Sequence, residues 1–138
     1  FLKKIKKKSV VLNKESLGFI GNRLQFALLR EAISLVEKGI ASPEDIDEVV
    51  KSGFGRRLAI AGPFQVFDLA GWDTISTIMK ELFPVLENTS KVSDVVNQKV
   101  IDGHLGVKSS KGFYRWDKDI VEEFRKGIVQ KLSDIDQL

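Results

Sequence analysis

An asparagine opens the longest apolar helix that the sequence predicts. When residues 18–39, GFIGNRLQFALLREAISLVEKG, are wound at about 100° per residue, their charged side chains occupy an arc of roughly 120° and their apolar side chains an arc of about 200°. Asn22 lies near the edge of the apolar arc, in the first turn. Because a buried amide without hydrogen-bond partners is costly, Asn22 either donates to a ligand carbonyl or satisfies a neighbouring backbone group. Gln25, in the middle of the arc, has no role that the sequence explains.

Three other side chains are candidates for chemistry. His104 is the single histidine, and it has no serine or cysteine nucleophile pattern beside it, so we interpret it as a solvated loop residue. Asp68 lies in a short apolar segment, where we expect a structural partner such as a nearby arginine, or a neighbouring helix that it caps. Lys108 precedes the segment GFYRW and either meets an anion or is an ordinary surface lysine.

The sequence lacks the motifs of metal and phosphate sites. The absence of cysteine excludes disulfides and thiolate ligands, and one histidine cannot form a histidine cluster. No loop has the spacing of calcium ligands. The glycine-rich residues 53–62 do not form G-x-G-x-x-G, follow a predicted helix rather than a strand, and precede no Walker-type lysine. We therefore expect no metal site and no phosphate loop in this chain.

The basic charge of the chain is confined to its first residues. The net charge is +3, and removing the five positive charges of Lys3, Lys4, Lys6, Lys7 and Lys8 leaves −2 for the rest. A basic patch can bind nucleic acid or anionic lipid, but no aromatic residues interleave with these lysines and no nucleic-acid motif follows. We interpret the patch as a solvated helix end and expect neither a nucleic-acid nor a membrane partner. Cytoplasmic is the default location, because the sequence has no secretory signal and no long apolar run.

Apart from one strand, the sequence predicts helices. Residues 9–14, SVVLNK, alternate in polarity and are expected to form a short strand. The capping residues and periodicity then predict a helix at 18–39 and five more that lie within residues 43–53, 63–71, 74–87, 93–103 and 120–132, with 53–62 as a loop. The fold class is therefore all-α, with about five or six helices. Because an apolar arc of about 200° is too wide for a helix that covers one side of a small monomer, we expect burial at the centre or against a second subunit.

Three segments together resemble a known family. They read KSVVLNKESLGFIGNRLQFALLREAISLVEKGIASPEDID, GPFQVFDLAGWDT and LGVKSSKGFYRW. In order and spacing they are similar to the C-terminal domain of the NAD-dependent 3-hydroxyacyl-CoA dehydrogenases, including the 3-hydroxybutyryl-CoA dehydrogenases, from about Lys8 to Trp116. The resemblance implies a helical dimerisation domain of the 6-phosphogluconate dehydrogenase C-terminal type and a homodimeric oxidoreductase of fatty acid metabolism.

The same resemblance implies a reaction and a division of labour. Such enzymes oxidise a 3-hydroxyacyl-CoA to the 3-oxoacyl-CoA, with NAD and the catalytic His–Glu pair in an N-terminal Rossmann domain. Residues 1–14 are then expected to be a remnant of that domain, and residues 15–138 the helical domain that forms one wall of the substrate cleft. Asn22 matches the family's asparagine that helps to hold the polarised substrate oxygen. Lys108 matches a lysine that reaches toward the cofactor. The chain by itself is expected to be inactive, because it lacks the general base.

One segment departs from the family pattern. Many members have a short G-x-G-x-P-M-GP connection where this sequence has the longer GFGRRLAIAGP. The longer form resembles the lambda-crystallin and gulonate-dehydrogenase branch. A sugar-acid dehydrogenase fragment and a non-catalytic helical dimerisation module are therefore the two alternative hypotheses.

Overall fold

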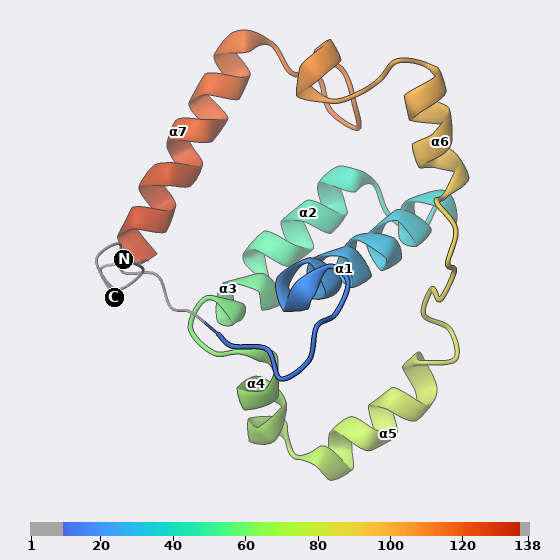
Figure 1. Cartoon of the computed structure of the whole chain (residues 1–138), viewed down its shortest axis with the longest axis vertical. Helices are drawn as coiled ribbons and strands as arrows, with labels where there is room; N and C mark the ends of the chain where they lie inside the picture. Colours follow the sequence, from blue (N-terminus) through green and yellow to red (C-terminus); the bar gives the residue numbers. More distant parts are fainter. Residues whose placement is uncertain (1–9, 136–138) are drawn as a thin grey trace. The chain divides into compact units, whose positions relative to one another are not determined.

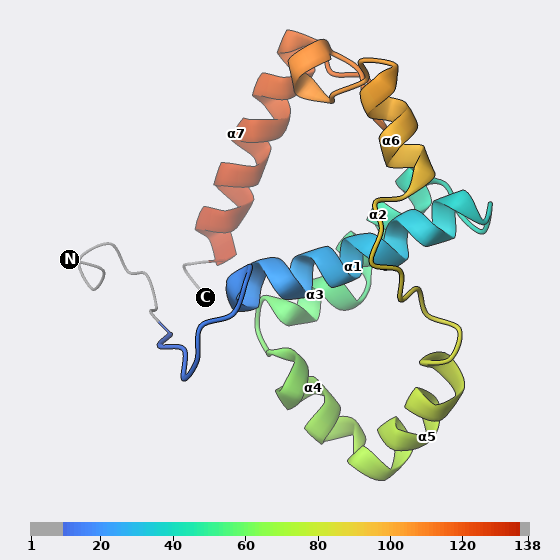
Figure 2. The ribbon, with the colours of Figure 1, turned by 45° about the vertical axis from the view of Figure 1, so that its right-hand side comes forward.

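A computed structural model describes residues 10–135 of the chain, which divides into two units, Phe1–Arg30 and Glu31–Leu138. Each unit is described by itself. Seven α-helices and one short 3-10 helix follow one another along the described residues, and no strand lies among them (Figures 1 and 2). The predicted all-α class is confirmed. No helix within residues 10–135 has the length and apolar character needed to cross a membrane.

The N-terminal unit contains the approach to the first helix. The strand predicted at 9–14 is not formed over residues 10–14, since a strand needs a partner and no described segment pairs with it. Residue 9 and the lysine patch lie outside the described residues. Helix α1 (Phe19–Glu37) begins after Gly18, whose φ of 82° lies in the left-handed region that favours glycine. The glycine immediately before the helix therefore has a conformational role.

A tight corner joins the next two helices. Helix α2 (Pro43–Ser52) begins with the predicted cap, in which the Ser42 hydroxyl donates to the Asp45 carboxylate at 2.6 Å and thereby lowers the pKa of Asp45. The interpretation of residues 53–62 as a loop was wrong in part, because helix α3 (Phe54–Leu58) forms within them. A Cβ atom at Gly53 would lie 2.5 Å from the Val49 carbonyl oxygen, so this corner requires glycine.

Another corner joins α4 (Pro63–Ala70) to α5 (Trp72–Leu82) through Gly71, which has a φ of 87°. The indole N–H of Trp72 donates to the Asp68 carboxylate, which gives Asp68 the predicted structural role with a different partner. The Trp72 ring also lies 6.4 Å from that of Phe67. Ile75 of α5 is the one buried large apolar side chain among residues 10–135, at 9% exposure.

Carboxylates on the last turns of α1 hold the long connection that follows α5. Glu31 accepts the backbone N–H of Glu87 at 2.7 Å, and the hydroxyl of Ser34, which is 2% exposed, donates to the Glu87 carboxylate at 3.2 Å. Glu37 accepts the backbone N–H of Val95 at 3.0 Å, in the first turn of α6 (Asp94–Ile101). These bonds fix the start of α6, and α6 leads directly into the loop that carries Lys108.

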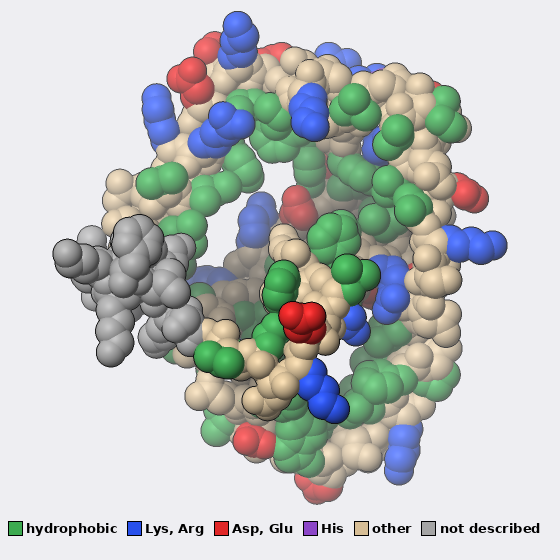
Figure 3. All heavy atoms as spheres, in the orientation of Figure 1, with side chains coloured by type: hydrophobic (Ala, Val, Ile, Leu, Met, Phe, Trp, Pro, Cys, Tyr) green, Lys and Arg blue, Asp and Glu red, His purple; other side chains and the backbone are tan. Residues whose placement is uncertain are grey.

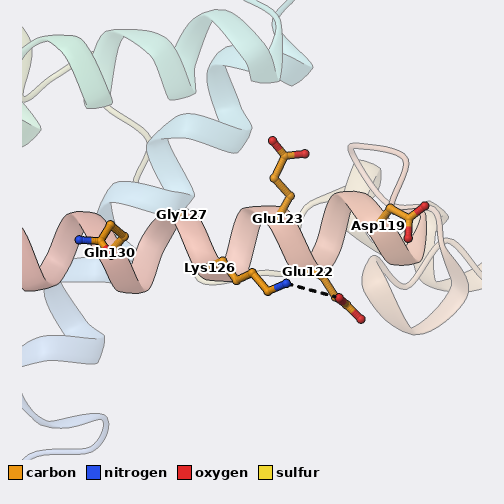
Figure 4. A pocket seen from close by; sticks show the side chains of 6 residues that line it. All are labelled: Asp119, Glu122, Glu123, Lys126, Gly127 and Gln130. Carbon is orange, nitrogen blue, oxygen red and sulfur yellow. Dashed lines mark ion pairs between the residues drawn. The ribbon is translucent and has the colours of Figure 1, made fainter.

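Helix α7 (Lys118–Ile135) has one apolar and one polar face. The predicted stripe of Ile120, Phe124, Ile128 and Leu132 is 44–56% exposed, and Figure 3 shows many other hydrophobic side chains at the surface of the described chain. The polar face of α7 carries Asp119, Glu122, Glu123, Lys126 and Gln130, and Glu122 and Lys126 form an ion pair of 3.8 Å there (Figure 4). The other described residues therefore leave this apolar stripe largely uncovered.

Candidate functional site

Asn22 lies in the first turn of α1, within the N-terminal unit. Its side chain is exposed and has no hydrogen-bond partner among the described residues. Of the two roles that the sequence left open, a bond to a neighbouring backbone group is therefore not formed in this structure. The amide keeps two donors and a carbonyl acceptor for another molecule. Gln25, one turn further on, is also exposed.

Lys108 lies in a tightly folded loop of the second unit, within the 3-10 helix η2 (Val107–Ser109). Gly106 has a φ of 77°, and its N–H donates to the Lys111 carbonyl at 2.8 Å. A Cβ atom at Gly112 would lie 2.8 Å from the Cα atom of Gly106, a backbone approach that no rotamer change relieves. The glycines of the segment LGVKSSKGFY are therefore needed to close the loop on which Lys108 stands.

Ser109 stabilises the same loop from within. Its hydroxyl oxygen accepts the backbone N–H of Leu105 at 2.7 Å and donates to the Lys111 carbonyl at 3.0 Å. The backbone N–H of Trp116 donates to the Ser110 carbonyl at 2.9 Å, which closes the outer end. Because these bonds pair backbone groups on both sides of η2, they hold the backbone around Lys108 in one conformation.

A cavity of about 400 Å³ lies between α6 and this loop. Its lining includes the side chains of Lys99, His104, Lys108, Val96, Leu105 and Phe113. The Lys99 ammonium donates to the Gly112 carbonyl at 3.1 Å and lies 4.3 Å from the centroid of the Phe113 ring. His104 is half-buried against this cavity, so it is less solvated than we predicted. No motif in the sequence marks Lys99, which lies 13 residues before Gly112 and meets it only through the fold.

Tyr114 attaches the loop to α2. Its hydroxyl donates to the Asp47 carboxylate at 2.8 Å, and its ring meets that of Trp116 edge-on at 6.1 Å. Burial raises the pKa of Tyr114 to about 12, with smaller contributions from the hydrogen bond and charge of Asp47 and the charge of Glu44. The bond joins residues 67 positions apart, and the sequence alone gave no signal for it.

The raised pKa of Tyr114 predicts a loss of stability at high pH. Tyr114 keeps its proton in the folded chain up to about pH 12, whereas the unfolded chain releases it near 10.0. Because the folded pKa is raised, the stabilisation is complete below pH 10 and decreases as the pH rises from 10 to 12. Urea denaturation of the chain at pH 9, 10 and 11 is expected to show this decrease, and Tyr114→Phe should have a shallower dependence over the same range. Equal slopes for the two proteins would contradict the assignment.

The two residues that the sequence selected lie in different units, and each is described within its own. Within residues 10–135, no group of three histidine, aspartate or glutamate side chains is placed to hold a metal ion. What the described structure offers is an unpaired amide at the start of α1 and a cationic, partly apolar cavity after α6. Both arrangements are able to bind polar groups of a small molecule.

The described residues form a helical domain that carries the LG…GFY loop between α6 and α7. The sequence model of "3-hydroxyacyl-CoA dehydrogenase, C-terminal domain" matches residues 18–116, from the start of α1 to the end of the Lys108 loop. The chain belongs to this family. Helix α7 lies beyond the matched region.

The chain is also similar to curated relatives and to a solved structure. The chain is 35% identical over 123 residues to a 5-formyl-3-hydroxy-2-methylpyridine 4-carboxylate 5-dehydrogenase from Mesorhizobium japonicum, covering 89% of this chain and 40% of the relative. It is 37% identical over 107 residues to the lambda-crystallin homolog of Rattus norvegicus, covering 70% and 34%. A crystal structure of the same kind of pyridine-carboxylic acid 5-dehydrogenase, described as an NAD+-dependent dismutase, superimposes with a TM-score of 0.89 at 34% identity, covering 93% of this chain and 41% of that one. This chain thus spans well under half the length of these proteins.

Proposed function

We propose that this chain is the substrate-side and dimerisation domain of an NAD-dependent dehydrogenase that oxidises a 3-hydroxyacyl-CoA to the 3-oxoacyl-CoA. The observation that carries the proposal is the family match over residues 18–116, which contains both Asn22 and Lys108. The unpaired amide of Asn22 supports it, because a donor without a partner is available to a substrate oxygen. The matched structure is described as NAD+-dependent, which supports the choice of cofactor.

In this proposal the two residues act on different molecules. The NAD cofactor, held mainly by an N-terminal Rossmann domain of the longer protein, supplies the hydride acceptor. The Asn22 amide donates to the oxygen at the reacting carbon, where charge is redistributed as the hydroxyl becomes a carbonyl. The Lys108 ammonium attracts the negatively charged part of the cofactor. The general base is not among these residues, so the proton of the hydroxyl passes to a group outside this chain.

We also propose that two copies of the chain form a homodimer. The apolar stripe of α7 supports this, since its four side chains are half-exposed in the second unit. Among the described residues, the Phe124 ring contacts one other aromatic ring, that of Trp116, with the ring centroids 5.4 Å apart. A second copy offers the same apolar faces, as the self-complementary interface of a two-fold dimer requires.

One other substrate class has a specific observation in its favour. The relative from Mesorhizobium japonicum and the superimposed crystal structure both act on a methylpyridine carboxylate rather than an acyl-CoA. A planar ring that bears a carboxylate is therefore the second candidate. The sugar-acid alternative has the lambda-crystallin homolog as a relative.

The proposal is tested with the longer protein and with this chain, side by side. With NADH and acetoacetyl-CoA, the longer protein should oxidise the nicotinamide at 340 nm, whereas residues 1–138 alone should show no turnover above the background. Parallel assays with 5-formyl-3-hydroxy-2-methylpyridine 4-carboxylate and with gulonate, each with NAD+, compare the alternatives. Faster turnover of either compound would replace the acyl-CoA assignment, and turnover by the 138-residue chain would contradict the division of labour.

A further inference from the structure

We propose that the cavity between α6 and the Lys108 loop is a binding subsite for an anionic oxygen group, a phosphate or a carboxylate, and that Lys99 is its second cation. The inference extends the proposed function, which assigns only Lys108 to this region. It concerns Lys99, which lies outside every motif that the sequence analysis used. The subsite is built entirely from residues of the second unit.

The charge of the cavity is of one sign. Two ammonium groups and one imidazole line it, and none of its lining residues has a carboxylate. Asp102 is the acidic residue nearest to Lys99 along the chain, and its carboxylate accepts a hydrogen bond from the side-chain amide of Gln98 at 2.7 Å. Two like charges on one small cavity raise each other's free energy, and a bound anion relieves this repulsion.

Lys99 is held in a defined position, unlike an ordinary surface lysine. It is half-buried, and its ammonium is fixed between the Gly112 carbonyl at 3.1 Å and the face of the Phe113 ring at 4.3 Å. An ammonium group has three donors, and the Gly112 carbonyl uses one of them. The Phe113 ring lies against another side of the ammonium group, which leaves one donor for a ligand, and the side-chain entropy of ordering Lys99 has already been lost in the free protein.

The rest of the lining selects a ligand with an apolar part. Val96, Leu105 and Phe113 contribute hydrocarbon surface beside the two ammonium groups. Leu105 is 50% and Phe113 is 39% exposed, so both have surface left to cover. A free inorganic anion would leave this surface in water, whereas an anion attached to a ring or chain would cover it.

Binding is measured on the 138-residue chain by two-dimensional ¹H–¹⁵N spectra in 150 mM NaCl. The probes are sodium pyrophosphate, which represents a dinucleotide diphosphate, and pyridine-4-carboxylate, which represents a ring carboxylate. We expect saturable shifts at the amides of Gly106, Lys108, Gly112 and Phe113 with at least one probe. The probe that binds more tightly identifies the source of the anion.

The variants separate a subsite from general attraction to a basic protein. Lys99→Gln and Lys108→Gln should each raise the dissociation constant by about five- to tenfold, since each removes one charged donor from a partly screened site. Lys99→Arg should restore binding, because it keeps the charge and the donors. Lys80→Gln, on the exposed surface of α5, is the matched control and should have no effect.

Saturable binding that all three glutamine variants weaken equally would overturn the proposal, as would the absence of saturable shifts. Equal loss in Lys99→Gln and Lys99→Arg would show that Lys99 only supports the loop, and this too would overturn it. None of these measurements requires dehydrogenase activity. The subsite can therefore fail while the proposed reaction stands, or hold while that reaction fails.

Discussion

Asn22→Ala in the longer protein is expected to lower kcat by one to three orders of magnitude and to leave the melting temperature nearly unchanged. The expected loss corresponds to about 1.4–4 kcal/mol of transition-state stabilisation, and removal of one donor to a developing charge typically costs about 2.7–4 kcal/mol, the upper part of this range. Stability should not change, because the Asn22 side chain is exposed and contributes no hydrogen bond among the described residues. Steady-state kinetics and a thermal melt of the same preparation measure both quantities.

Two further variants make this result specific to the amide donor. Asn22→Asp keeps the size of the side chain but replaces its two donors with a negative charge, so turnover should fall at least as far as in Asn22→Ala. Gln25→Ala removes the next amide along the same helix and should leave kcat within about twofold of the parent value. Normal turnover in Asn22→Asp would rule out the donor role. A large stability loss with normal turnover in Asn22→Ala would assign a structural role instead.

The parts of the fold that local chemistry determines were predictable. Helix α2 begins at Pro43 after the cap at Ser42, and α6 follows a cap at Ser93, as the sequence indicated. Both predictions rest on bonds within one turn, which a short window of sequence contains. Helix α3 was not predicted, because the glycines around it usually indicate a loop. In the structure, Gly53 instead allows the chain to pass close to the backbone of Val49 just before this helix begins.

The candidate site shows the same division between local and long-range information. Asn22 could be selected because an amide at the edge of an apolar arc is conspicuous in sequence, and Lys108 because it stands before GFYRW. Lys99 and the bond from Tyr114 to Asp47 could not be found, since each depends on contact between segments that only the folded chain brings together. The partner of Lys99 is a backbone carbonyl and the partner of Tyr114 is a surface aspartate, and neither group is conspicuous in a sequence.

The apolar stripe of α7 leads to the second large expected effect, on the oligomeric state. The 138-residue chain is expected to sediment as a dimer at micromolar concentration, and Ile128→Glu should shift it toward the monomer. A carboxylate at this position would have to be buried in an apolar interface, which costs about 3 kcal/mol and raises the dissociation constant roughly 100-fold. Sedimentation velocity over a range of concentrations measures the shift.

Ser133→Glu is the matched control, because it adds the same charge to the same helix at a position about 140° around from Ile128. Ser133 is exposed on the polar side of α7, and the variant should remain dimeric. Circular dichroism of both variants should show similar helix content, so that a monomer reflects a lost interface and not a lost helix. A wild-type chain that is monomeric at micromolar concentration would contradict the dimer, and equal dissociation of both variants would place the interface elsewhere. The stripe lies beyond the region that the family model matches, so dissociation by Ile128→Glu alone would mean that the dimer depends on a helix outside the matched domain.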